Sequence, residues 1–291
     1  MSGLGQGSGV TVDQCVQCSG LFLDHGEFTR LRRHFGGAGG QLEGRPVPAG
    51  PSPKVMDGDS LGIVILQYVT GVPLEVDTPQ VVFPPAVLFI VVVNAVVLTI
   101  ALLQGLREWV FLLGMVPADI RRGWRLWTLL TSMFMHGGPF HLLGNMLFLY
   151  ILGDNLESRF GWWRFLLFYV VCGLVANLVY VFSATQPHLP SVGASGAVSG
   201  VLGAYLVLWP GRRLLIRIFY FLWVHSRIEV PVWVYLGFWI LMQLALAQLD
   251  VPGVAWMAHV GGFACGVVIG LSARWLAHWS GTAPGGSAVG R

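Results

Sequence analysis

The chain has 291 residues, of which 55% are hydrophobic and 11% are charged, whereas soluble domains average roughly 45–50% apolar and about 25% charged residues. This composition excludes a soluble globular protein and indicates a membrane protein with several spans. The net charge is only +3, and the 17 cationic residues are scattered. They form no phosphate-binding surface, so we expect no nucleic-acid partner.

The first 84 residues differ in composition from the rest. Residues 1–20 lack the apolar core of a secretory signal, so we expect the N-terminus to stay in the cytosol. Residues 1–35 are predicted to form a cytosolic motif, and residues 36–84 a flexible, Gly- and Pro-rich linker followed by a pre-membrane segment. The apolar stretch 61–69 is too short for a spanning helix, which needs about 20 residues, and is expected to be interfacial or strand-like.

Six apolar runs follow, at about 86–104, 139–156, 163–183, 195–209, 231–248 and 255–278. They predict an all-α membrane domain of six transmembrane helices over residues 85–279, with a disordered tail over 280–291. The fourth run, which begins at Ser195 and stops at Pro210, is short for a full crossing. Its N-terminus should therefore be recessed below the bilayer surface, which implies a water-filled cavity.

The distribution of cations predicts the orientation. With the N-terminus inside, the cytosolic segments hold 13 of the 17 Lys and Arg residues, and the other four lie in the first loop, at about 105–138. That loop also carries three Trp residues and is expected to be half-embedded in the interface. We therefore expect a multi-pass integral membrane protein with both termini in the cytoplasm.

Polar side chains at bilayer depth are costly and are candidates for function. Ser195 and His259 lie on different predicted spans, and a serine hydroxyl becomes a good nucleophile when a histidine takes its proton. Alternatively, Ser195 merely bonds back to its own helix and His259 is a satisfied buried histidine. The nearest carboxylate, Asp250, is predicted to lie in a loop, so catalysis would use a Ser–His dyad whose imidazole is fixed by something other than a buried acid.

Small residues recur every four positions on the fourth and sixth spans, which favours close contact between these helices. Ser195 lies one residue before the first stripe begins, and His259 lies one residue after the first member of the second stripe, so both residues lie beside the predicted contact. The stripes are Gly196, Gly200 and Ala204 on the fourth span, and Ala258, Gly262, Gly266 and Gly270 on the sixth.

His141 and Asn145 are four residues apart on the second predicted span and share a face. With the Ser195 backbone N–H, their side chains could stabilise the oxyanion that forms when a hydroxyl attacks a carbonyl. The alternatives are an interhelical hydrogen bond, or a metal site that uses His136 and His141. The metal site is disfavoured because no membrane carboxylate lies nearby and a catalytic zinc usually has three protein ligands.

Four segments together resemble the rhomboid family of intramembrane serine proteases: HGGPFHLLGNM (136–146), GDNLESRFG (153–161), GASG (193–196) and AHVGG (258–262). The resemblance covers about residues 85–278. It implies that Ser195 is the nucleophile, that His259 is the general base and that His141 and Asn145 are oxyanion donors.

The same resemblance implies supporting roles for other residues. His136 would support the first loop, Glu157 and Gly161 would form a structural cap after the second span, and Gly193 and Gly196 would let the backbone approach the substrate closely. Two features depart from the family pattern. Ser199 stands where many members have an aromatic that stacks on the catalytic histidine, and the first-loop Trp-Arg pair is shifted away from His136.

Residues 12–31 resemble half of a small zinc ribbon of the transcription-factor type. A Cys₄ zinc site needs four ligands, and only Cys15 and Cys18 are present, with His25 and His34 poorly spaced as substitutes. Either an upstream C-x-x-C is missing or no metal binds. We favour a degenerate remnant or a partner-docking tail.

The sequence therefore predicts an intramembrane serine endopeptidase that needs no cofactor and resides in a bacterial plasma membrane. Its partners would be the lipid bilayer and transmembrane protein substrates with small residues near the outer interface. Two alternatives come from other classes. One is a catalytically silent rhomboid-like protein that binds membrane clients. The other is a small transporter or channel, which is disfavoured because the sequence shows no acidic relay and no inverted repeat.

Overall fold

The structure, a computed structural model, describes residues 83–220 and 223–279, together with 13–14, 21–22, 67 and 73–75. The chain divides into two units, residues 1–52 and 53–291. In the first unit, β1 (Asp13–Gln14) pairs in antiparallel fashion with β2 (Leu21–Phe22). Most of the predicted linker, most of the stretch 61–69 and the C-terminal tail lie outside the described residues, so the predicted domain boundaries stay predictions.

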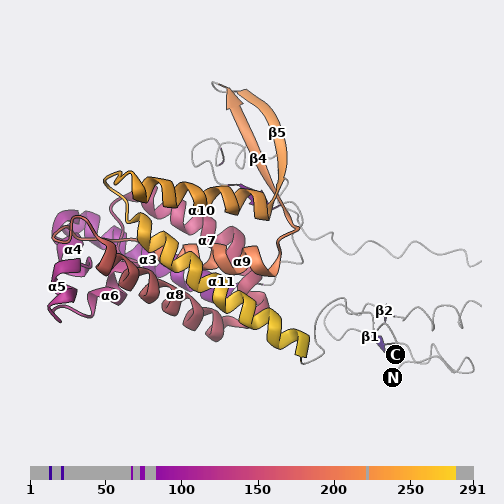
Figure 1. The fold of residues 1–291 in the computed structure, drawn as a ribbon, viewed down its shortest axis with the longest axis horizontal. Coiled ribbons are helices and arrows are strands. Elements are labelled where there is room, and N and C mark those ends of the chain that lie inside the picture. The colour runs from indigo at the N-terminus through magenta and orange to yellow at the C-terminus, as the bar shows by residue number, and fades with distance from the viewer. Residues whose placement is uncertain are drawn as a thin grey trace, which may run out of the picture. The chain divides into compact units, whose positions relative to one another are not determined.

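The second unit is mostly helical (Figure 1). Three of its described helical stretches are long and apolar enough to cross a membrane, namely Pro85–Gln104, Trp162–Ser183 and Trp256–Leu276. The helices are α3 (Pro85–Gln104), α4 (Leu106–Leu113), α5 (Pro117–Arg121), α6 (Thr128–Thr131), the 3₁₀ helix η1 (Ser132–Phe134), α7 (Pro139–Phe160), α8 (Trp162–Ser183), α9 (Ser195–Leu208), α10 (Val232–Gln248) and α11 (Trp256–Trp279).

Helix α9 forms the centre of the bundle. All ten of its residues 196–205 are buried, and it packs against α7, α8, α10 and α11. A helix that is apolar on every side is stable only when other helices enclose it. Helix α9 is therefore enclosed by the other helices of the bundle.

The contact between α9 and α11 is made largely through backbone atoms. A Cβ built on Gly262 would overlap the carbonyl oxygen of Gly196, and one built on Gly266 would overlap the carbonyl oxygen of Gly200. Only glycine permits so close an approach of two helices. The two small-residue stripes face each other, as the spacing predicted.

A three-stranded antiparallel sheet adjoins the helices (Figure 1). It contains β3 (Leu74–Glu75), β4 (Arg213–Tyr220) and β5 (Trp223–Pro231), in the order β3-β4-β5. The hairpin of β4 and β5 was not anticipated, because the cations of this segment predict a cytosolic loop. Strand β5 leads directly into α10.

A partly buried ion pair ties β3 to the helical bundle. Arg212 Nη1 lies 2.7 Å from Glu75 Oε1, and the Glu75 side chain is 1% exposed. Arg212 also donates to Asn155 Oδ1 at 2.7 Å, while Tyr205 donates its hydroxyl to Glu75. A buried carboxylate is tolerable when it is paired and hydrogen-bonded in this way.

Glu157 makes more specific contacts than the structural cap that the family resemblance implies after the second span. Its two carboxylate oxygens accept hydrogen bonds from the backbone N–H groups of Ala86 and Val87, at 2.9 and 2.8 Å. These donors lie in the first turn of α3, where a helix has unsatisfied N–H groups and favours negative charge. Glu157 therefore joins the end of α7 to the start of α3.

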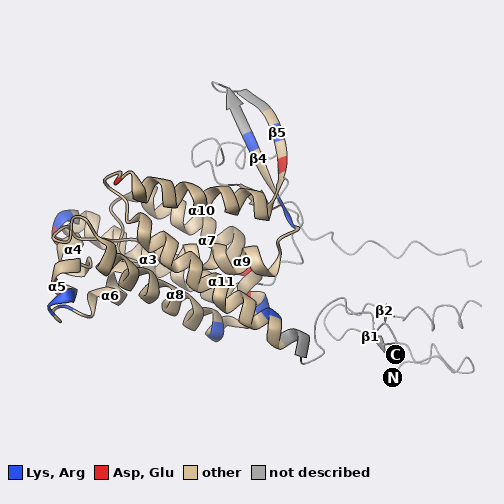
Figure 2. Cartoon of the chain, viewed as in Figure 1, with Lys and Arg blue, Asp and Glu red and all other residues tan. Residues whose placement is uncertain are grey.

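The charged residues of the described bundle lie mainly at its two ends (Figure 2). One group lies on α4 and α5, and the other lies on β4, β5 and the ends of α8 and α11. The apolar middle between them suits the hydrocarbon core of a bilayer. The second unit is therefore an integral membrane domain.

Candidate active site

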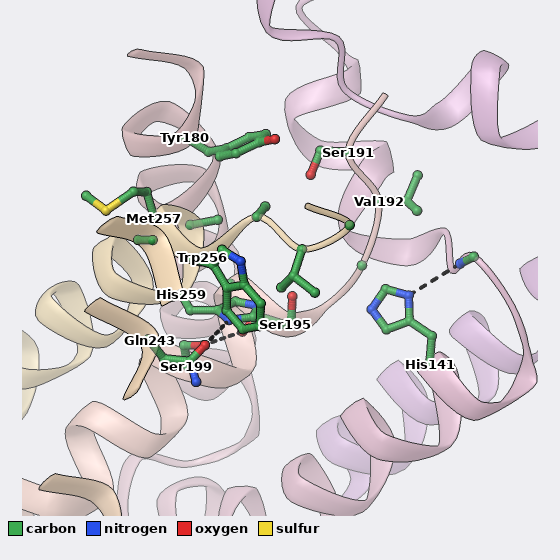
Figure 3. Close-up of a pocket in the computed structure, with 18 of the residues that line it drawn as sticks. His141, Tyr180, Ser191, Val192, Ser195, Ser199, Gln243, Trp256, Met257 and His259 are labelled. Carbon is green, nitrogen blue, oxygen red and sulfur yellow. Dashed lines mark hydrogen bonds between the residues drawn. The ribbon is translucent and has the colours of Figure 1, made fainter. Parts of the chain in front are cut away.

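A cavity of about 800 Å³ surrounds the N-terminus of α9 (Figure 3). Its lining includes four predicted site residues, Ser195, His259, His141 and Asn145, together with residues of α10 and of the segment that leads into α11. Gly193 and Gly196 also line it. The structure therefore brings residues from α7, α9 and α11 to one hollow, whereas His136 and Glu157 are buried outside its lining.

Hydrogen bonds fix the segment that precedes Ser195. Met115 and Ser191 exchange backbone hydrogen bonds, and Gly193 N–H donates to Ser132 O at 2.9 Å. Gly193 has φ of +134°, and a Cβ there would lie 2.9 Å from the His141 ring. Both its conformation and its surroundings therefore require glycine.

His136 supports the segment before Ser195, although it does not itself line the cavity. Its Nε2 atom accepts a hydrogen bond from Ala194 N–H at 3.5 Å, and its ring packs edge-on against His141 at 5.1 Å. Burial, reinforced by nearby His141, lowers the pKa of His136 to about 3. His136 is therefore neutral at physiological pH, as an acceptor at Nε2 requires.

The contact between α9 and α11 places Ser195 and His259 in the lining of one cavity. A Cβ on Gly196 would lie 3.8 Å from the carbonyl oxygen of Ala258, so the residues next to Ser195 and His259 touch. Within residues 83–220 and 223–279, no hydrogen bond joins Ser195 Oγ to His259. Catalytic hydrogen bonds are often long in a protein without substrate and tighten when substrate binds.

Three side chains that were not predicted as site residues surround the His259 imidazole, and Figure 3 shows two of them, Gln243 and Trp256. Gln243 Oε1 lies 2.7 Å from His259 Nδ1. Trp239 stacks on the ring at 6.0 Å with an interplanar angle of 29°, and Trp256 packs edge-on at 6.1 Å. The sequence carries one signal for these contacts, because Gln243 is a polar amide within an apolar run as long as a membrane helix.

Ser199 does not take the place of the missing aromatic residue. Its hydroxyl donates to the carbonyl oxygen of Ser195 at 2.6 Å, which is a hydrogen bond within α9. The aromatic that stacks on His259 comes instead from α10, as Trp239. The ring contact that the family resemblance places at position 199 is therefore made from a different helix.

His141 and Asn145 lie on α7 and line the same cavity as His259. His141 Nδ1 accepts a hydrogen bond from Gly137 N–H at 3.4 Å, which leaves the proton of the neutral ring on Nε2, the nitrogen nearer Gly193. Asn145 Nδ2 donates to His141 O at 3.1 Å. In Figure 3, Ser195 lies between His259 and His141.

The candidate zinc ligands Cys15, Cys18, His25 and His34 lie outside the described residues. Among the residues that the structure describes, no group of three His, Cys, Asp or Glu side chains could hold a metal ion. Cys172 and Cys265 are free thiols on α8 and α11.

Comparison with known proteins agrees with this arrangement. A family model described as a rhomboid domain matches residues 123–276, just over half of the chain, and one described as a transcription factor zinc-finger matches residues 5–34. Relatives include RHOMBOID-like protein 5 of Arabidopsis thaliana, which is 35% identical over 145 residues, covering 50% of this chain and 43% of its own length. RHOMBOID-like protein 2 of Arabidopsis thaliana is 38% identical over 150 residues, covering 52% of this chain and 42% of its own.

Rhomboid protease GluP of Bacillus subtilis (strain 168) is 36% identical over 138 residues, covering 47% of this chain and 24% of its own. The match thus spans less than half the length of each of these three relatives. The zinc-finger match includes the segment that resembles half a zinc ribbon. The rhomboid-domain match contains the segments that carry Ser195, His259, His141 and Asn145, and the chain therefore belongs to the rhomboid family.

Proposed function

We propose that this protein is an intramembrane serine endopeptidase that cleaves peptide bonds in or near the transmembrane helices of other proteins. The observation that carries the proposal is the shared cavity, in which a serine at a helix N-terminus and a histidine on a contacting helix lie together. The name of the relative GluP supports it at the level of the family.

In the proposed mechanism, the Ser195 hydroxyl attacks a substrate carbonyl while His259 takes its proton, and His259 then returns the proton to the leaving amine. The oxyanion would be held by the Ser195 backbone N–H, His141 Nε2–H and the Asn145 amide, all of which line the cavity. The N-terminus of α9 adds its partial positive charge. Water in the cavity would hydrolyse the acyl-enzyme.

The chemistry of the bilayer constrains the substrate. A helix in hydrocarbon satisfies all its backbone groups internally, so it must unwind locally before a carbonyl can reach Ser195. Substrates with Gly, Ala or other small residues near the outer interface would be preferred, and Gly in particular lowers the cost of unwinding because it has a poor helix propensity.

The proposed topology has six membrane helices, α3, α7, α8, α9, α10 and α11, with both termini in the cytoplasm. The end of the bundle that carries β4 and β5 would then face the cytosol, which agrees with the excess of Arg residues in those strands and at the adjacent helix ends. With 14 residues, α9 would begin below the outer surface. The plasma membrane of a bacterium stays the predicted location.

The rival function is that of a catalytically silent client-binding protein with the same cavity. Reconstituted protein should be incubated with a model transmembrane substrate, as wild type, Ser195→Ala and Ser272→Ala. Ser272 is a matched control because its exposed hydroxyl bonds back to Val268 O on α11, outside the cavity. Loss of cleavage in Ser195→Ala alone, with substrate still bound, supports the protease. Binding without cleavage by the wild type would support the rival.

A further inference from the structure

Gln243 is the polar side chain that contacts the candidate base most closely. It lies on α10, is 2% exposed and lines the cavity. Its Oε1 atom lies 2.7 Å from Nδ1 of His259. This distance is typical of a strong hydrogen bond rather than of a chance approach.

The identity of the bonded atoms determines where the imidazole carries its proton. A carbonyl oxygen can only accept, so a hydrogen bond between Gln243 Oε1 and Nδ1 requires the proton to be on Nδ1. Nε2 of the neutral ring then carries the free lone pair. Only an unprotonated ring nitrogen can take the proton of a serine hydroxyl.

A second contact from the same helix restricts rotation of the ring. Trp239 and Gln243 are four residues apart and so share one face of α10. The indole stacks on the face of the imidazole, while the amide binds its Nδ1 edge. Together, the two contacts fix the tilt of the imidazole plane and restrict rotation of the ring within that plane.

No carboxylate in the cavity lining is seen to take this role. Asp250, the acidic residue in the described lining, accepts no hydrogen bond from His259 and instead accepts one from the Thr185 hydroxyl at 2.9 Å. We propose that Gln243 is the positioning residue of the dyad, which orients His259 and keeps its proton on Nδ1 so that Nε2 faces Ser195. This inference rests on the proposed serine-protease function and deepens it.

Gln243 differs in charge from the acid of a serine-protease triad. A neutral amide fixes the orientation and tautomer of the imidazole but adds no full charge to stabilise the imidazolium. A carboxylate at the same position would keep the acceptor and add that charge. Gln243→Glu should therefore retain function, whereas Gln243→Met, which keeps the length of the side chain but removes the acceptor, should not.

The first test measures how fast a fluorophosphonate labels Ser195 in detergent-solubilised protein. Gln243→Met should slow labelling by about 10²-fold, the lower end of the contribution of a general base, and Gln243→Glu should restore it. Gln248→Met is the matched control, because Gln248 is exposed on the last turn of α10 and lies outside the cavity. Wild-type labelling in Gln243→Met would overturn the inference.

The second test reads the tautomer directly and does not depend on catalysis. In ¹⁵N-histidine-labelled protein, the His259 signals, assigned by their loss in His259→Ala, should show the proton on Nδ1. In Gln243→Met this preference should disappear, while the melting temperature confirms that the variant is folded. A proton on Nε2 in the wild type would overturn the inference. If Ser195 were never labelled, the proposed function would fail, but the NMR spectrum would still decide the role of Gln243.

Discussion

Replacing Gly262 with alanine tests whether the contact between α9 and α11 holds the two candidate catalytic residues together. Its new Cβ would overlap the Gly196 carbonyl oxygen, one residue from Ser195. Because the obstacle is backbone, no side-chain rotation can relieve it. The helices must move apart by about 1 Å, and a misplacement of that size costs about 10²-fold in rate.

The effect on stability should be much smaller. Overpacking costs about 1–3 kcal/mol, and alanine regains about 1 kcal/mol of helix propensity over glycine. Gly262→Ala should therefore lose about 10²-fold in cleavage rate in proteoliposomes while its free energy of unfolding falls by no more than about 2 kcal/mol.

Two other glycines provide controls. Gly237 on α10 has no atom within 4 Å of an added Cβ, so Gly237→Ala should leave cleavage unchanged. At Gly270, an added Cβ would lie 3.2 Å from Ala204 Cα, so Gly270→Ala should have an intermediate effect. Wild-type cleavage by Gly262→Ala would refute the reasoning.

Three further predictions concern single side chains. Asn145→Ala should lower the cleavage rate by about 10²- to 10³-fold with an unchanged melting temperature, since one oxyanion donor is lost; a normal rate would remove Asn145 from the site. Glu157→Ala should lower the free energy of unfolding by about 2–3 kcal/mol, because two buried N–H groups of α3 lose a charged acceptor. Arg212→Met should cost about 3–5 kcal/mol in the same denaturation assay, since the buried Glu75 carboxylate loses its arginine. An unchanged unfolding curve for either variant would show that the contact is not stabilising.

Local spacing in the sequence was enough to predict the α9–α11 contact. Small residues at every fourth position define one face of a helix whatever surrounds it, and Gly262 and Gly266 do meet the backbone of α9. From that contact, a common location for Ser195 and His259 followed. The i, i+4 spacing of His141 and Asn145 on one face had already extended the predicted site to these two residues, which line the same cavity.

The contacts that were missed depend on three-dimensional arrangement. Glu157 lies 70 residues from Val87, and nothing in either segment indicates the bond between them. Trp239 lies within an apolar run, and only the packing of α10 against α11 shows that it stacks on His259. The β4–β5 hairpin was missed because its cations resembled those of an ordinary cytosolic loop.

The most direct test of the proposed dyad is to treat solubilised protein with a fluorophosphonate that reacts with activated serines. Wild-type protein should be labelled, whereas Ser195→Ala should not be labelled and His259→Ala should be labelled at most weakly, because the Ser195 hydroxyl then has no base. Equal labelling of all three proteins would contradict the account.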